Sequence, residues 1–166
     1  MTNPGPESSS VQAMVGIEEI KTVELFRDLD DSTLEGLAAA SSTRKLARGD
    51  VLFKENDEPL DLFVVVSGRL AMVIRSVDGR ESVVALMEPG DLFGEMPLFD
   101  GLKRSTDGRA LEASEVIVIP YAPLQKLYSE QPSQLWRVVE LLATRLRVVD
   151  GVLADSVFLD VTGRTA

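Results

Sequence analysis

Residues 67–104 read SGRLAMVIRSVDGRESVVALMEPGDLFGEMPLFDGLKR, and this stretch decides the fold. Two apolar runs rich in β-branched residues, at 70–74 and 82–87, lie on either side of an Asp-Gly pair at 78–79. An Asp-Gly pair between two such runs is a strong hairpin signal, because both residues tolerate the backbone conformation of a tight turn. The sequence therefore predicts an antiparallel hairpin here.

Similar short runs continue on both sides of this hairpin. They lie at 51–53, 62–66 and 115–120. The segments between the runs are turn-forming, and they include Arg48-Gly49-Asp50, Ser67-Gly68 and Pro89-Gly90-Asp91. Evenly spaced short strands with such turns between them predict an antiparallel sandwich, barrel or roll.

The two ends of the chain have a different character. Residues 1–16 are rich in Ser, Pro and Gly without any period, which predicts a disordered tail. Apolar residues then recur at helical spacing over 17–29, and Asp31-Ser32-Thr33 is an expected N-cap cluster for a second short helix. The sequence thus predicts two helices before the strands begin.

A regular apolar seam follows the strands. Its members alternate in steps of four and three, and they are Leu135, Val139, Leu142, Leu146, Val149 and Leu153. This spacing is typical of a helix that pairs with another helix, although one face of a helix that packs on the roll would look alike. Apolar residues on the other side, Leu141, Val148 and Val152, favour contact with both the roll and a second copy.

The composition argues against several classes of function. The chain has no cysteine and no histidine, which removes disulfides, thiolate chemistry and the commonest metal ligand. Lys and Arg total 17 against 27 Asp and Glu, a formal charge of −10 that opposes DNA binding by the chain as a whole. No apolar run is long enough for a membrane span, and no signal pattern occurs. We expect a cytoplasmic protein that is not an enzyme and holds no metal.

The stretch around the hairpin resembles the cyclic-nucleotide-binding domain of the cyclic-AMP receptor and fumarate/nitrate regulator (Crp/Fnr) family of bacterial transcription regulators. The similarity rests on PGDLFGE at 89–95, on Arg-Ser at 104–105, and on LADSVFLDVTGRTA at 153–166. It implies a mainly β fold with flanking helices, an antiparallel double-stranded β-helix (a jelly-roll-like β-roll) followed by a long dimerisation helix. The expected parts are a tail at 1–16, the β-roll with its N-terminal helices at 17–134, the dimerisation helix at 135–159, and a hinge at 160–166 toward an absent helix-turn-helix domain.

The resemblance implies a phosphate-binding cassette from Phe93 to Ala110. Gly94 allows a close approach of the backbone to a ligand, and Arg104 offers paired donors to a phosphodiester. Glu95 accepts a hydrogen bond from the ribose, as the family implies. Taken singly, these residues could be a turn glycine and a salt bridge, whereas the joint pattern favours the cassette. The expected ligand-binding residues are Gly94, Glu95, Met96, Arg104, Ser105 and Thr106.

Two places depart from the family pattern. Thr106-Asp107-Gly108 replaces the usual Ala and strand-forming residue, so a carboxylate is expected near an anionic ligand, and the glycine weakens a strand. Either change could enlarge the pocket or lower its affinity. On the dimer helix, Val149 and Asp150 fall where cyclic-AMP-responsive relatives carry polar residues that meet the adenine edge. Valine has no side-chain hydrogen bond to offer and a carboxylate can only accept, so the choice between cyclic AMP, cyclic GMP and another ligand stays open.

The resemblance implies the sensor half of a homodimeric regulator, with a cyclic nucleotide such as cyclic AMP as effector. DNA contact is expected only through the absent domain, and no membrane contact is expected. A degenerate roll that no longer binds a nucleotide and serves as a dimerisation scaffold is the alternative. A cupin-type enzyme shares short strands and Gly-rich turns, but cupins normally hold their metal through histidines, which this chain lacks.

Overall fold

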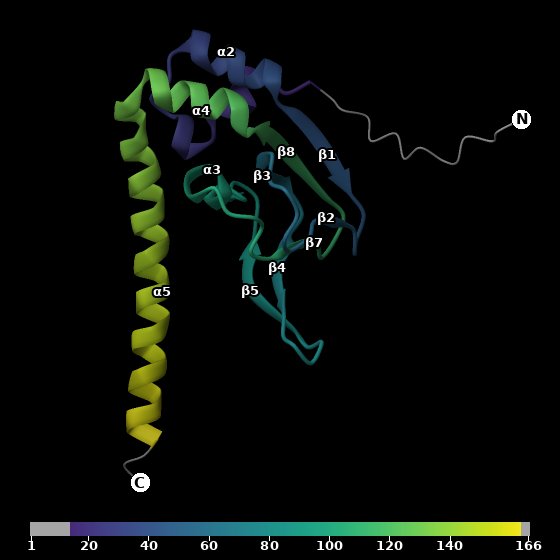
Figure 1. Ribbon diagram of the computed structural model, residues 1–166, viewed down its shortest axis with the longest axis vertical. Helices are drawn as coiled ribbons and strands as arrows, with labels where there is room; N and C mark the ends of the chain where they lie inside the picture. Colours follow the sequence, from purple (N-terminus) through teal and green to yellow (C-terminus); the bar gives the residue numbers. More distant parts are fainter. Residues whose placement is uncertain (1–13, 164–166) are drawn as a thin grey trace, which may run out of the picture. The chain divides into compact units, whose positions relative to one another are not determined.

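The structure, a computed structural model, describes residues 14–163 and the side chains of residues 14–151. In this part the body of the fold consists of two antiparallel four-stranded sheets, ordered β1-β8-β3-β6 and β2-β7-β4-β5. The strands are β1 (Ser42–Leu46), β2 (Val51–Phe53), β3 (Asp61–Ser67), β4 (Leu70–Arg75), β5 (Glu81–Met87), β6 (Leu92–Phe93), β7 (Asp107–Ala110) and β8 (Ser114–Pro120). Figure 1 shows β1, β8 and β3 side by side, and the β4–β5 hairpin at the end of the roll away from α2 (Asp31–Ala40).

The expected hairpin is confirmed. β4 and β5 pair antiparallel from Leu70 opposite Met87 to Arg75 opposite Glu81. The turn is closed by a hydrogen bond from the Gly79 N–H to the Ser76 carbonyl at 2.9 Å. The expected runs at 51–53, 62–66, 70–74, 82–87 and 115–120 all lie in strands, whereas β1, β6 and β7 were not predicted.

The core lies between the two sheets. Its buried members come from both of them, and they are Leu46, Leu52, Phe53, Phe63, Val65, Leu70, Met72, Phe93, Ala110 and Val116. The outward side chains of the first sheet are also covered, because Leu62 and Ile119 are 0% exposed. A sheet with both faces covered reads as continuous apolar runs, which explains LFVVV and EVIVIP.

The N-terminal helices differ in detail from the expectation. The single helix expected over 17–29 is two elements, α1 (Ile17–Lys21) and the 3₁₀ turn η1 (Glu24–Phe26). Thr22 interrupts the helix, and its hydroxyl donates to the Glu19 carbonyl at 2.7 Å. The N-cap of α2 is Asp30 rather than the cluster at 31–33, since its carboxylate accepts from the Thr33 N–H at 2.9 Å.

The remaining helices are α3 (Met96–Asp100), α4 (Tyr121–Glu130), the 3₁₀ turn η2 (Pro132–Gln134) and α5 (Leu135–Gly163). The long helix expected at 135–159 is present as α5, which continues to Gly163 and so includes residues 160–163 of the expected hinge. Together with the two sheets, it confirms the expected β-roll class. The chain divides into two compact units after Lys126, and α5 belongs to the second. No helix among the described residues is both long enough and apolar enough to cross a bilayer.

Five seam residues of α5 have described side chains, and all are exposed: Leu135 37%, Val139 51%, Leu142 39%, Leu146 60% and Val149 54%. Leu153 and Val152 lie outside the described side chains. Residues 1–13 of the expected tail and 164–166 of the expected hinge also lie outside the described residues. The helix therefore offers an apolar stripe that the described part of one chain leaves accessible.

Candidate functional site

The Arg104 side chain turns into the protein and is only 5% exposed. Its Nη1 donates to the Gly94 carbonyl at 2.9 Å and to the Tyr121 hydroxyl at 3.3 Å. Its Nη2 donates to the Asp61 carbonyl at 2.5 Å. Within the described residues, three of the five guanidinium N–H groups thus have protein acceptors, and the Nε–H and one Nη2 N–H remain for a ligand.

Two phenylalanines, from β2 and β3, lie against this guanidinium, and a third, from β6, packs on those two rings. The Cζ atom of Arg104 lies 4.4 Å from the ring centroid of Phe53 and 5.4 Å from that of Phe63. The Phe53 and Phe63 centroids are 5.6 Å apart, and Phe93 lies 5.4 Å from Phe63. A cation over an aromatic face is attracted by the ring quadrupole, so the ring cluster helps to fix the plane of the guanidinium.

Burial dominates the electrostatics of the site. It lowers the pKa of the Arg104 guanidinium, while Tyr121, Asp61 and Asp57 act in the opposite direction. Burial likewise raises the pKa of the Asp61 carboxyl, and the Arg104 charge opposes that rise. Because an arginine stays protonated even when its pKa falls, the site holds a fixed positive charge among apolar rings. Such a charge suits a small anion.

Gly94 lies against this arginine. Its φ is +78°, and a Cβ there would lie 2.8 Å from Nη1 of Arg104 and 3.1 Å from Cδ2 of Phe63. The Gly94 backbone was expected to approach a ligand closely. In this structure its close neighbour is the Arg104 side chain. Glu95, the next residue, is 2% exposed and occupies the N-cap position of α3. The cation and the carboxylate of the expected cassette are both buried in the roll.

A short helix, α3, begins directly after Glu95, but it offers few free backbone N–H donors. The helix has five residues, and Pro97 in its first turn has no N–H. Met96 is 57% exposed. The N-terminus of this short helix therefore adds little to the positive charge of the site.

The remaining predicted residues have different surroundings. Ser105 is exposed, and Thr106 is half-buried with its hydroxyl 3.8 Å from the Met72 sulfur. Val149 and Asp150 are exposed on α5, in the second unit of the chain. The structure thus brings Gly94 and Arg104 into contact, and the ligand-binding roles of all the expected residues stay predictions.

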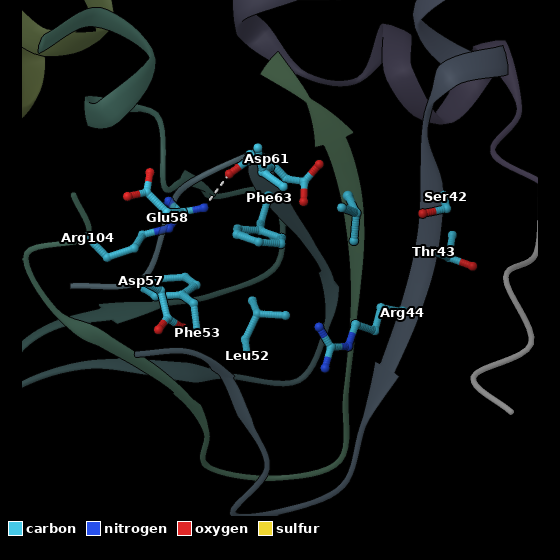
Figure 2. A pocket seen from close by; sticks show the side chains of 12 residues that line it. Ser42, Thr43, Arg44, Leu52, Phe53, Asp57, Glu58, Asp61, Phe63 and Arg104 are labelled. Atoms are coloured by element: carbon cyan, nitrogen blue, oxygen red, sulfur yellow. Dashed lines mark hydrogen bonds between the residues drawn. The ribbon is translucent and has the colours of Figure 1, made fainter. Parts of the chain in front are cut away.

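A cavity of about 310 Å³ adjoins Arg104. Figure 2 shows Arg44 of β1 on one side of it, and Asp57, Asp61 and Arg104 on the other. The described residues that line it include none of Gly94, Glu95, Ser105 and Thr106. Sequence reasoning missed this cavity, because residues 42–44 were not predicted to form a strand.

The two departures from the family pattern, at positions 107 and 108, have close neighbours within the protein. The Asp107 carboxylate accepts from the Glu55 N–H at 2.7 Å and lies 3.8 Å from Nε of Arg75. Gly108 leaves no enlarged pocket, because a Cβ there would lie 2.8 Å from Cζ of Phe53. The ring of Phe53 already fills that space, so Gly108 does not enlarge the pocket. A lower affinity, the other expected effect of these departures, stays a prediction.

Comparison with known proteins supports the class of protein expected from the sequence. The model of the cyclic nucleotide-binding domain family matches residues 43–131, more than half of the chain. A CRP-like cAMP-activated global transcriptional regulator of Mycobacterium tuberculosis is 28% identical, over 86% of this chain and 63% of its own length. The cAMP-activated global transcriptional regulator CRP of Salmonella typhimurium is 33% identical, over 82% of this chain and 65% of its own. The crystal structure of Thermus thermophilus catabolite activator protein superposes with a TM-score of 0.67 at 30% identity, over 81% of this chain and 63% of that one.

The chain therefore belongs to the cyclic nucleotide-binding domain family, and its relatives are CRP-type transcription regulators. It spans 63% to 65% of the length of the two regulators named above.

Proposed function

We propose that this chain is the cyclic-nucleotide-sensing part of a cytoplasmic CRP-type transcription regulator, with cyclic AMP or a related nucleotide as its effector. Arg104 binds the ligand phosphate and Glu95 accepts from the ribose hydroxyl. Gly94, Met96, Ser105 and Thr106 complete the cassette. The roll comprises residues 17–134, and the signal passes through a homodimer formed by residues 135–159.

One observation carries this proposal: the charge of Arg104 is buried at 5% exposure on a cluster of aromatic rings. Burying a charge costs free energy unless hydrogen bonds and an opposite charge compensate it. Its hydrogen bonds go to carbonyl groups and a phenol rather than to a carboxylate. An anionic phosphodiester on the remaining Nε–H and Nη2 N–H would add a directly hydrogen-bonded countercharge in a bidentate geometry.

The test is calorimetric titration of the protein with cyclic AMP and cyclic GMP. We expect saturable binding that Arg104→Ala weakens by about 10- to 100-fold, since hydrogen bonds to charged groups contribute about 1.5–3 kcal/mol each. Arg80→Ala is the matched control, because Arg80 lies on the β4–β5 hairpin with its side chain 85% exposed. Equal affinity of the wild type and Arg104→Ala contradicts the proposed site.

The base side of the site is assigned to Val149 and Asp150 on α5. Asp150 accepts from an exocyclic amino group, which both adenine and guanine carry, and only guanine adds an N1–H. We therefore expect Asp150→Ala to weaken the binding of cyclic GMP more than that of cyclic AMP. Contact with DNA is assigned to a part of the regulator other than residues 1–166, on the strength of the net charge of −10.

A scaffold without ligand is the second candidate. The engagement of Arg104 by Gly94, Tyr121 and Asp61 favours it, because protein acceptors already satisfy three guanidinium N–H groups. In that case neither nucleotide binds the wild type, and the dimer forms equally well in Arg104→Ala. The same titration thus separates the two candidates.

A further inference from the structure

Asp107 at the start of β7 ties two distant segments together. Its Oδ1 accepts from the Glu55 N–H at 2.7 Å, across 52 residues of sequence. The Asp107 residue is 8% exposed. A buried carboxylate that accepts a backbone N–H makes a charge-assisted hydrogen bond, which is shorter and stronger than one between neutral groups. Asp107 therefore fixes the loop that follows β2.

This loop, residues 54–57, holds the backbone of Arg104 on both sides. The Asn56 N–H donates to the Arg104 carbonyl at 2.9 Å, and the Arg104 N–H donates to the Asp57 carbonyl at 3.4 Å. The loop is itself closed by the Asp57 carboxylate, which accepts from the Lys54 N–H at 3.0 Å. The Asp107 carboxylate is therefore connected to the backbone of the arginine through the loop at 54–57 and the hydrogen bonds at its two sides.

Gly108 acts on the other end of the same arginine. A Cβ at this position would lie 2.8 Å from Cζ and 2.9 Å from Cε1 of Phe53. That ring is packed against Phe63, and the Arg104 guanidinium lies 4.4 Å from its centroid. A side chain at residue 108 would therefore force the ring under the guanidinium to shift.

We propose that Asp107 and Gly108 are positioning residues that set the backbone and the guanidinium plane of Arg104 for a phosphate ligand. The proposal rests on the proposed function only for the identity of that ligand. Bidentate binding through Nε and Nη2 needs a fixed guanidinium plane, since both N–H groups must point at the two phosphate oxygens together. The two departures from the family pattern thus both act on the position of Arg104.

A purely electrostatic role of Asp107 and a positioning role predict opposite effects of Asp107→Ala on ligand affinity. If Asp107 only repelled an anion, both Asp107→Ala and Asp107→Asn would tighten cyclic AMP binding, because both remove the charge. If Asp107 positions Arg104, Asp107→Ala weakens cyclic AMP binding by about three- to tenfold. Asp107→Asn stays within about threefold of the wild type, since its amide oxygen still accepts from Glu55.

Two measurements test the proposal: the affinity for cyclic AMP, and the Nε–H resonance of Arg104 in the NMR spectrum of the ligand-free protein, assigned by its loss in Arg104→Lys. Asp50→Ala is the matched control, because Asp50 also accepts a backbone N–H, that of Ala47, at 2.8 Å in a turn of the same roll. We expect Asp107→Ala and Gly108→Ala to shift or broaden the Arg104 resonance. Asp107→Asn and Asp50→Ala are expected to leave it in place.

An unmoved Arg104 resonance in Asp107→Ala and Gly108→Ala overturns the proposal. So does a loss of affinity no larger than that of Asp50→Ala. If the wild type binds no cyclic nucleotide, the proposed function fails, and the resonance alone decides whether these two residues position Arg104. The two failures are thus separate observations.

Discussion

Tyr121 lies between the Arg104 guanidinium and the Gly94 carbonyl of the cassette. Its hydroxyl accepts from Nη1 of Arg104 at 3.3 Å and donates to the Gly94 carbonyl. Burial raises the pKa of the phenol, while the Arg104 charge opposes that rise. The neutral phenol can donate and accept at once, so it links the arginine to the backbone that follows β6.

Tyr121→Phe should lower the free energy of unfolding by about 1–3 kcal/mol, because it removes two buried hydrogen bonds of about 0.5–1.5 kcal/mol each. Denaturant unfolding of the ligand-free protein measures this. In an Arg104→Ala background the same change should cost less, since one of the two partners is already gone. Equal losses in both backgrounds would show that the two side chains are not coupled.

Both tyrosines of the chain, Tyr121 and Tyr128, should ionise later in the folded protein than in the unfolded chain. Burial raises the pKa of Tyr128 from 10.0 to about 12. A raised phenol pKa favours the neutral form in the fold, so stability is fully present below pH 10.0 and is lost as the pH rises toward about 12. Ultraviolet titration of the phenolate, with and without urea, measures the difference. Coincident curves would contradict the burial of both rings.

The Gly94-to-Arg104 spacing could be read from the sequence, but the partners of the arginine could not. Ten residues separate this pair, whereas Tyr121 lies 17 residues beyond Arg104. The Asp107 bond to Glu55 spans 52 residues. Such contacts form only when the strands have paired. The charge of Asp107 was therefore evident from the sequence, but its hydrogen-bond partner was not.

The strands that were not predicted from the sequence are those whose formation depends on pairing with neighbouring strands. β1 reads STRKL, which carries no apolar alternation, yet it pairs with β8 from Ser42 opposite Val118 to Leu46 opposite Ser114. β7 reads DGRA and is held between β2 and β4. Strand preference depends strongly on context, so such segments become strands through their partners.

Two elements leave apolar surface exposed in the described part of a single chain. β5 exposes Val83 at 58%, Val84 at 53% and Leu86 at 50%, and the α5 seam is exposed as described above. A large exposed apolar surface commonly marks an interaction site. A second copy of the chain that pairs along the seam would cover that part of it.

Leu142→Glu with Leu146→Glu should therefore convert a dimer into monomers in light scattering, because the pair would place carboxylates inside the helix interface. Ala143→Glu with Thr144→Glu is the matched control, since these neighbouring positions on α5 are exposed and lie off the seam. A wild type that stays monomeric at high concentration, or a control that dissociates equally, contradicts dimerisation through this face.

At the scale of the whole molecule, the charge decides the expected behaviour toward DNA. The net charge is −10, and the sequence pI is about 4.5. Several of the basic side chains also have acidic partners within the chain. These ion pairs include Lys21 with Asp31, Arg27 with Glu24, Arg69 with Glu112, and Arg75 and Arg109 with Glu81.

Residues 1–166 should thus give no gel shift with any duplex at moderate salt, with or without cyclic AMP. Non-specific DNA affinity comes mainly from cations that displace counterions from the phosphates, and an acidic chain with paired cations supplies few of them. Binding of cyclic AMP measured in the same buffer controls for folding. A shift that saturates and weakens as salt rises would reveal a basic face, and would move the DNA contact into this chain. No shift, together with retained nucleotide binding, is the result expected of a sensor that contacts DNA through another part of its regulator.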